Sequence, residues 1–174
     1  MSSIANMLDE RFGETVDPHR ATYYERLFAP VSLIKIESPE IVHFLKFMES
    51  VDKSHYFSSF QEEEFTLIWL VDVLGNIRIA IEEAVPPPGP SQQRQFPAPK
   101  AIARLCNRLG HPALVSADPA RVGGEIYYDN GEWIINNRSG RYGLNLGRQK
   151  KHLDHVALSF EAVGIKVEVD FLES

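Results

Sequence analysis

The N-terminal part of the chain repeats apolar residues at the spacing of an amphipathic helix in two places. The first run covers residues 4–12 and stops at Gly13, a residue that commonly ends a helix. The second follows Ser38, a good N-cap, with Pro39 at the first helical position. We therefore predict one short helix and a loop in the first 30 residues, then a second helix from residue 39 to near Ser50.

Two pairs of apolar, β-rich runs are each separated by a short turn sequence. Residues 65–74 and 77–83 flank Gly75-Asn76, and residues 122–128 and 132–137 flank Asp129-Asn130-Gly131. Turn residues of these types between two such runs predict β-hairpins. The run over 65–74 is continuously apolar, which is typical of a central strand buried on both faces.

The remaining segments complete the expected fold. Residues 98–109 show helical spacing, with Gly110 placed as a C-cap. We expect another helix over 149–162 and a half-buried strand over 165–171, where apolar and polar residues alternate. The Pro-rich residues 86–99 are expected to form an internal surface loop or flexible connector rather than regular structure. Together these elements predict a single α+β domain over residues 1–174, with a mixed or antiparallel sheet of about five strands and three to four helices.

Composition and charge exclude several classes of protein. The chain is 44% hydrophobic and 24% charged, as soluble globular proteins are, and it has no apolar run long enough to cross a membrane. Its net charge of -6 lacks the broad basic surface that nucleic-acid binding requires. The charge is uneven, because residues 1–97 sum to -7 and residues 98–174 to +1. Hence we expect neither nucleic acid nor membrane as a partner, whereas one anionic ligand remains compatible with the C-terminal half.

The N-terminal sequence and the cysteine content bear on the localisation of the protein. The N-terminus lacks a basic segment followed by an apolar one, so we expect no signal peptide and a cytoplasmic place of synthesis. Secretion by a route that uses no classical signal peptide stays open. The single cysteine, Cys106, excludes an internal disulfide and a cysteine-based zinc site, and we expect it to be a small buried hydrophobic residue.

The densest group of polar residues follows the last strand of the second hairpin. Its members are candidate ligand-binding residues because Asn, Ser and Arg side chains after a strand often form ligand loops, and guanidinium groups suit phosphate or carboxylate. They are Asn137, Arg138, Ser139, Arg141 and Tyr142. Gly140 and Gly143 would let backbone N–H groups approach a ligand closely. The alternative is a tight turn with Asn caps and two solvated arginines.

Glu125 and His111 are the candidate catalytic residues. Glu125 lies on the strand opposite residues 135–137, so we expect it to face the loop over residues 137–142, which we call the arginine loop. There it would serve as an acid or base, as a ribose-binding group or as a structural partner of Arg138. His111 follows a predicted helix end and is either a general base or a cap for helix carbonyls. His152 and His155 have the spacing of a metal pair but no third ligand, so no metal site is predicted. Glu62-Glu63-Glu64 is interpreted as a solvated turn.

Taken together, three stretches resemble a module of bacterial polymorphic toxins and secreted effectors. They are Gly110-His-Pro-Ala-Leu-Val, Ala120-Arg-Val-Gly-Gly-Glu-Ile and Trp133-Ile-Ile-Asn-Asn-Arg-Ser-Gly-Arg-Tyr, in which a Gly-Glu strand precedes an Asn-Asn-basic-Ser-Gly-Arg-Tyr loop. The upstream hairpin at residues 69–80 fits the same layout. The resemblance implies a role in bacterial conflict or host manipulation, and it marks Glu125 and the residues of the arginine loop as site positions.

Two functional hypotheses follow. In the first, the arginine loop holds a phosphate-bearing small molecule such as NAD or another nucleotide. Arg138 and Arg141 would bind its phosphates, Tyr142 would stack on a ring and Glu125 would serve an ADP-ribosyl-transfer-like reaction. In the second, the chain is a non-enzymatic immunity or adaptor protein whose acidic N-terminal half binds a basic partner, such as a cognate toxin or a target protein.

Overall fold

The computed structural model describes all residues except 1–2, 53–64, 87–94, 99–105, 145 and 174. The described residues form an α+β fold with a mixed sheet, as the sequence predicts. The helices are α1 (Ile4–Phe12), α2 (Tyr23–Leu27), α3 (Pro39–Asp52), α5 (Lys150–Ala162) and the 3-10 helix η2 (His111–Val115). The strands are β1 (Ile34–Lys35), β2 (Leu67–Asp72), β3 (Ile77–Ile81), β4 (Glu83–Val85), β5 (Phe96–Pro97), β6 (Asn107–Leu109), β7 (Ala120–Asp129), β8 (Glu132–Asn136) and β9 (Val167–Asp170).

The main sheet has six strands in the order β1-β3-β2-β7-β8-β9. Its neighbouring strands are antiparallel except for β8 and β9, which run parallel. Both predicted hairpins are present as β2–β3 and β7–β8. Every residue of β2 is buried, which confirms its predicted central position. The sheet exceeds the predicted five strands because β1 adds to the edge at β3.

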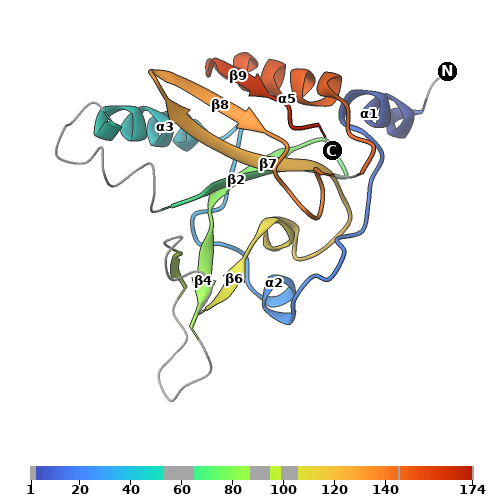
Figure 1. Cartoon of the computed structure of the whole chain (residues 1–174), viewed down its shortest axis with the longest axis horizontal. Helices are drawn as coiled ribbons and strands as arrows, with labels where there is room; N and C mark the ends of the chain where they lie inside the picture. The colour runs from blue at the N-terminus through green and yellow to red at the C-terminus, as the bar shows by residue number, and fades with distance from the viewer. Residues whose placement is uncertain (1–2, 53–64, 87–94, 99–105, 145, 174) are drawn as a thin grey trace.

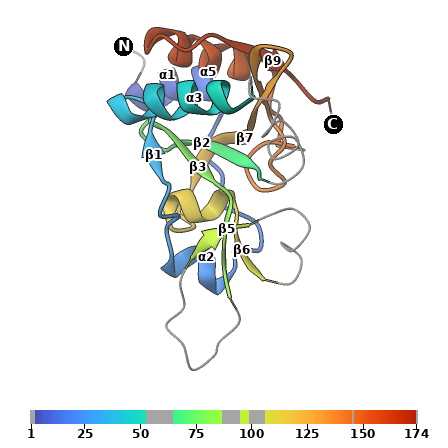
Figure 2. The same ribbon diagram turned by 90° about the vertical axis from the view of Figure 1, so that its left-hand side faces the viewer.

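Helices α1, α3 and α5 cover one face of this sheet (Figure 2). Phe12, Leu45 and Phe160 of these helices join Trp69 and Ile135 of the strands in the largest apolar cluster. Helix α1 ends at Gly13 as predicted, with a φ of 83° and its N–H donated to the Asp9 carbonyl. The predicted helices over 39–50 and 149–162 are confirmed as α3 and α5, and β9 alternates between half-buried and exposed residues.

The other face of the main sheet is covered by η2, and α2 and a three-stranded sheet of order β5-β4-β6 pack against η2 (Figures 1 and 2). Ile68 and Leu70 of β2 pack there against Leu114 of η2 and against Tyr142. Only Glu82 separates β3 from β4, so the chain passes from one sheet into the other at this residue. The junction between the two sheets is therefore a place where several distant segments meet.

The predicted helix over 98–109 is wrong at its C-terminal end. Asn107–Leu109 is strand β6, which pairs with β4 so that Arg108 lies opposite Ala84 and Leu109 is buried. This long-range pairing outweighs the local helical spacing, whose members at 102 and 105 lie outside the described residues. Gly110 is accordingly no helix C-cap but the residue that precedes η2, with Pro112 in the first turn of that helix.

Two further predictions need correction. Within the Pro-rich segment 86–99, Phe96 and Pro97 form β5 at the edge of the small sheet, where a proline needs no ladder hydrogen bond. Residues 87–94 and Pro99 of this segment lie outside the described residues. The first 30 residues hold a second helix, α2, because Thr22 and Glu25 form a capping box at its N-terminus.

Candidate functional site

Strand β7 places Glu125 on the face of the main sheet that carries the small sheet. Glu125 pairs in register with Ile68 and Gly124 pairs with Trp69, and those two β2 side chains point to opposite faces. Because side chains alternate along a strand, Glu125 points the same way as Ile68. Its backbone N–H donates to Asn136 Oδ1 at 2.9 Å, so it lies across from the end of β8 as predicted.

The glycines of this region serve close packing of the backbone. A Cβ at Gly124 would overlap with the carbonyl oxygen of Asn136, and one at Gly143 would overlap with those of Asn137 and Gly123. The loop after β8 therefore folds directly against β7, which only residues without a side chain permit. Gly140, by contrast, has open space at its Cβ position.

Three polar residues of the predicted loop, together with Asn136 at the end of β8, hold the shape of the loop from within. Asn137 forms two hydrogen bonds with the backbone of Leu172, donating to its carbonyl and accepting from its N–H. Ser139 Oγ accepts from the backbone N–H of Tyr142, and Asn136 Oδ1 accepts from that of Arg138. The Tyr142 ring is fully buried, and its hydroxyl donates to the Asp118 carbonyl at 3.0 Å. Asn137, Ser139 and Tyr142 thus direct their polar groups into the fold.

The two arginines of the loop point toward carboxylates. Arg138 is the more exposed, with 61% of its side chain accessible, and its Nη1 lies 3.8 Å from Glu125 Oε2. Arg141 Nη1 donates to Glu25 Oε2 at 3.0 Å, and the Glu25 side chain is only 3% accessible. The contact between Arg138 and Glu125 is therefore loose, whereas that between Arg141 and Glu25 is a tight, largely buried ion pair.

A second buried carboxylate, Glu82, faces the same spot. Glu82 forms an ion pair with Arg108 of β6 and is 8% accessible. A Cβ built on Gly110 would lie 3.2 Å from Glu25 Oε1 and 3.8 Å from Glu82 Oε1, so both carboxylates flank this glycine. Burial raises the pKa of Glu82, the Arg108 guanidinium opposes the increase, and the charges of Glu125 and Glu25 add to it. We call Glu25, Glu82, Arg108, His111, Glu125, Arg138 and Arg141 the junction cluster.

His111 completes the cluster as a neutral imidazole. Its Nε2 lies 2.9 Å from the Gly124 carbonyl oxygen, which can only accept, so Nε2 carries the hydrogen and Nδ1 is left as an acceptor. Burial lowers the pKa of His111 to about 4, and the charges of Arg141 and Arg108 act in the same direction. At neutral pH the ring therefore offers a hydrogen-bond acceptor without a charge.

The structure thus brings together four residues selected from the sequence: Glu125, His111, Arg138 and Arg141. It adds three that the sequence patterns did not single out: Glu25, Glu82 and Arg108. Glu25 had one local signal, the Thr22–Glu25 capping box. Glu82 and Arg108 had none, because their pairing depends on the β4–β6 register.

The other candidates lie apart from the cluster or outside the described residues. His152 Nδ1 accepts from the backbone N–H of Gln149, and burial lowers its pKa to about 4. His155 Nδ1 lies 2.8 Å from the Lys151 carbonyl oxygen on the same helix. Cys106 is half-buried beside the small sheet rather than on a described helix, and Glu62–Glu64 are not described. Within the described part of the chain, no group of three His, Cys, Asp or Glu side chains could hold a metal ion.

Among the helices that the structure describes, none has the length and apolar character needed to cross a lipid bilayer. Comparison with known protein families, with curated proteins and with solved structures gives no match to this chain. Function is therefore inferred from the junction cluster itself.

Proposed function

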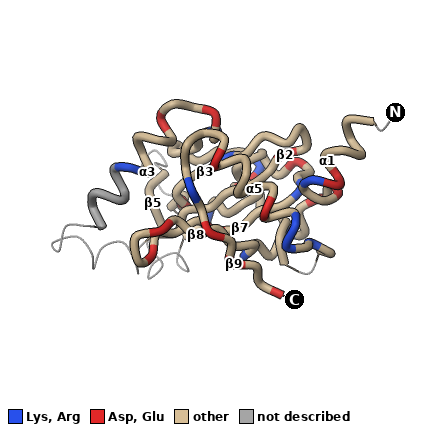
Figure 3. The backbone as a smooth tube through the Cα atoms, turned by 90° about the horizontal axis from the view of Figure 1, so that it is seen from above, with Lys and Arg blue, Asp and Glu red and all other residues tan. Residues whose placement is uncertain are grey.

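We propose that the junction cluster binds a phosphate-bearing small molecule of the nucleotide class in an effector-type protein. The observation that carries this proposal is the convergence of α2, β6, β7, η2 and the loop after β8 on one spot beside Gly110. Three guanidinium groups each pair with a carboxylate of this cluster, and the accessible fractions of the three arginine side chains differ. Along the described chain, acidic and basic positions are interspersed (Figure 3).

The gradation of burial suggests separate roles for the three arginines. Arg141 is held by a buried carboxylate and orients the loop, so its positive charge acts on the ligand through the electrostatic potential rather than through a direct contact. Arg138 and Arg108 have 61% and 48% of their side chains accessible, so a phosphate can approach both guanidinium groups from the solvent side. A ligand phosphate would replace the loose contact with Glu125 and release that carboxylate toward the rest of the ligand.

The released carboxylate suits ADP-ribosyl transfer. With NAD as donor, the bond between nicotinamide and ribose C1′ breaks and its electron pair leaves with nicotinamide. An acceptor nucleophile then bonds to C1′ and loses its proton. Glu125 would accept a hydrogen bond from a ribose hydroxyl and stabilise the positive charge that develops on the ring.

Calorimetric titration with ADP tests the binding proposal, with adenosine as the phosphate-free comparison. We expect ADP to bind and Arg138→Ala to weaken binding at least about tenfold, the loss typical of one charge-assisted hydrogen bond. Lys151→Ala removes one positive charge from α5, on the opposite face of the sheet, and should leave the affinity unchanged. Equal binding of adenosine and ADP, or no binding of either, would refute the proposal and favour the immunity or adaptor hypothesis.

The transfer reaction needs its own experiment. Bacterial growth is compared during expression of the wild type and of Glu125→Gln at matched levels of soluble protein, and NAD content is measured in the same cells. Growth arrest with loss of NAD in the wild type alone is the expected result. Equal arrest with both proteins would show that Glu125 is dispensable, and normal growth with unchanged NAD in both would remove the support for this reaction.

A further inference from the structure

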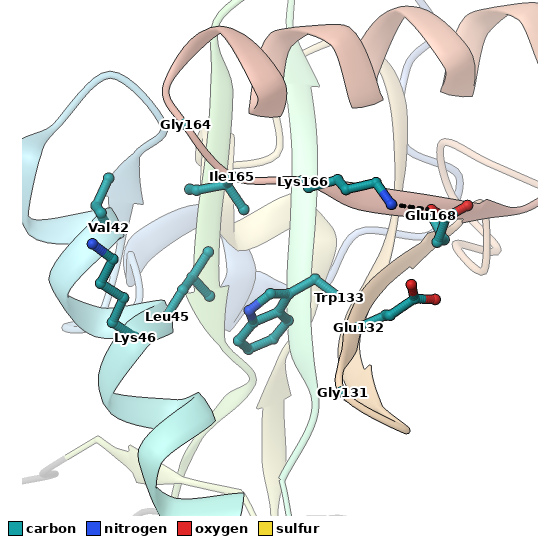
Figure 4. Close-up of a pocket in the computed structure, with 10 residues that line it drawn as sticks. All are labelled: Val42, Leu45, Lys46, Gly131, Glu132, Trp133, Gly164, Ile165, Lys166 and Glu168. Atoms are coloured by element: carbon teal, nitrogen blue, oxygen red, sulfur yellow. Dashed lines mark ion pairs between the residues drawn. The ribbon is translucent and has the colours of Figure 1, made fainter.

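A cavity of about 230 Å³ lies on the helix-covered side of the main sheet, away from the junction cluster (Figure 4). Helix α3 forms one wall with Leu45 and Lys46. The turn between β7 and β8 and the start of β8 form the other, with Glu132 and Trp133. Ile165, after α5, closes a third side. Three separate segments of the chain therefore line one space.

The inner surface of the cavity is apolar and its edge is charged. Leu45, Trp133 and Ile165 are buried residues of the main core, and the indole of Trp133 faces Leu45 across the cavity (Figure 4). At the edge, Lys166 Nζ lies 3.1 Å from Glu168 Oε1, and its side chain turns away from α3. The charge of Glu132 also acts on Lys166, so the edge formed by Glu132, Lys166 and Glu168 carries one net negative charge.

Lys46 and this negative edge stand on opposite sides of the cavity. Lys46 extends from α3 and Glu132 from β8, with the Trp133 ring between them (Figure 4). An ion of one sign would be attracted by one wall and repelled by the other. A molecule with an apolar body and opposite charges at its two ends satisfies both walls.

The volume of the cavity limits the class of molecule that it can bind. The cavity is smaller than the roughly 300 Å³ at which pockets for drug-sized ligands begin. The two charges of a free amino acid are carried on one carbon and cannot face opposite walls. A dipeptide separates its ammonium and carboxylate by up to about 7 Å, at about 3.5 Å per residue.

We propose that this cavity binds a short zwitterionic peptide with an apolar side chain. Its carboxylate faces Lys46, its ammonium faces Glu132 and its side chain lies against Trp133. This inference is independent of the proposed nucleotide function, since the two sites are on opposite faces of the sheet and share no residue.

The tryptophan indole N–H signals in nitrogen–proton NMR spectra provide the test. Trp69 is fully buried in the core and serves as an internal reference, and Trp133→Phe assigns the two signals. The probe is the dipeptide Ala-Leu, compared with its N-acetyl form and its C-terminal amide. We expect Ala-Leu to shift the Trp133 signal and leave the Trp69 signal in place.

Charge variants then decide between specific and merely apolar binding. Lys46→Gln should weaken Ala-Leu binding about threefold but leave binding of the amide unchanged, as a solvent-accessible ion pair predicts. Glu132→Gln should do the same for Ala-Leu but leave the N-acetyl form unaffected. Lys151→Gln, on the outer surface of α5, is the matched control and should change nothing.

Three results would overturn the proposal. One is an unmoved Trp133 signal at about 10 mM dipeptide, well above a Kd of about 1 mM, which corresponds to only ~4 kcal/mol. The second is equal affinity for Ala-Leu and both blocked forms, which would mean that any small apolar molecule fits. The third is binding that neither Lys46→Gln nor Glu132→Gln alters in a protein with an unchanged spectrum elsewhere.

Discussion

The ion pair between Glu25 and Arg141 gives the sharpest prediction about how the junction cluster is held together. It joins α2 to the loop after β8, two segments separated by 116 positions in the sequence. Glu25 Oε2 also accepts from the backbone N–H of Thr22 at 2.7 Å, so one carboxylate caps a helix and fixes an arginine. We predict that Glu25→Ala destabilises the fold and frees the loop.

The expected magnitude follows from the burial of the two partners. Removing one member of a fully buried pair costs about 3–5 kcal/mol, whereas exposed pairs contribute about 0–1 kcal/mol. Glu25 is almost fully buried but the Arg141 side chain is 30% accessible, so water can solvate part of its charge in the variant. We therefore expect Glu25→Ala to lower the free energy of unfolding by about 2–3 kcal/mol, of which about 1 kcal/mol is the lost helix cap.

A double-mutant cycle separates these contributions. Urea unfolding is measured for Glu25→Ala, Arg141→Ala and the double variant, and the expected coupling energy is about 1–2 kcal/mol. Thr22→Ala, which removes the cap hydroxyl and leaves the ion pair, should cost about 1 kcal/mol with no coupling to Arg141. A coupling below about 0.5 kcal/mol would refute the argument that this pair fastens the loop.

Two further predictions concern packing and pH. Gly124→Ala should lower the free energy of unfolding by about 3 kcal/mol or more, measured by thermal or urea unfolding, because the added Cβ has no room. Gly140→Ala should be nearly neutral, and similar losses in both variants would contradict the packing argument. The pKa values of His111 and His152 are lowered to about 4 in the folded chain, so the unfolded chain binds more protons between about pH 6.5 and 4. The contribution of each histidine to the free energy of unfolding is therefore fully present above pH 6.5 and is lost as the pH falls, by up to about 1.4 kcal/mol per pH unit for each histidine. The raised pKa of Glu82 changes the free energy of unfolding in the opposite direction. Urea midpoints that fall from about pH 6.5 to 5, with a shallower slope in His152→Gln, are the expected result, and a slope that this substitution leaves unchanged would contradict it.

Local patterns were sufficient to predict most of the main sheet and its helices. The hairpin β7–β8 follows from its Asp-Asn-Gly turn, where Asn130 and Gly131 both have positive φ, at 49° and 90°. Helix α3 follows from Pro39 and the apolar spacing behind it. In these segments the residues that define the element are neighbours in the sequence.

Features that depend on distant residues were not predictable in this way. Strand β6 has helical spacing and becomes a strand only because β4 is present to pair with it. The sequence around Gly143 is typical of a ligand-binding loop, yet this glycine is needed because a Cβ there would overlap the backbone of Asn137 and Gly123. The partner of Arg108 is Glu82, between β3 and β4, and the partner of Arg141 is Glu25 of α2; no local pattern of charge connects these segments.

The most direct test of the central claim is to map ADP onto the protein by backbone-amide NMR. We expect shifts that concentrate on Gly110, Glu125 and Arg138, which come from three separate segments of the chain. These shifts should disappear in Arg138→Ala while Lys151→Ala retains them. Shifts confined to the α5 side of the sheet, or an unchanged spectrum with ADP in excess, would contradict the assignment of the junction cluster as the ligand site.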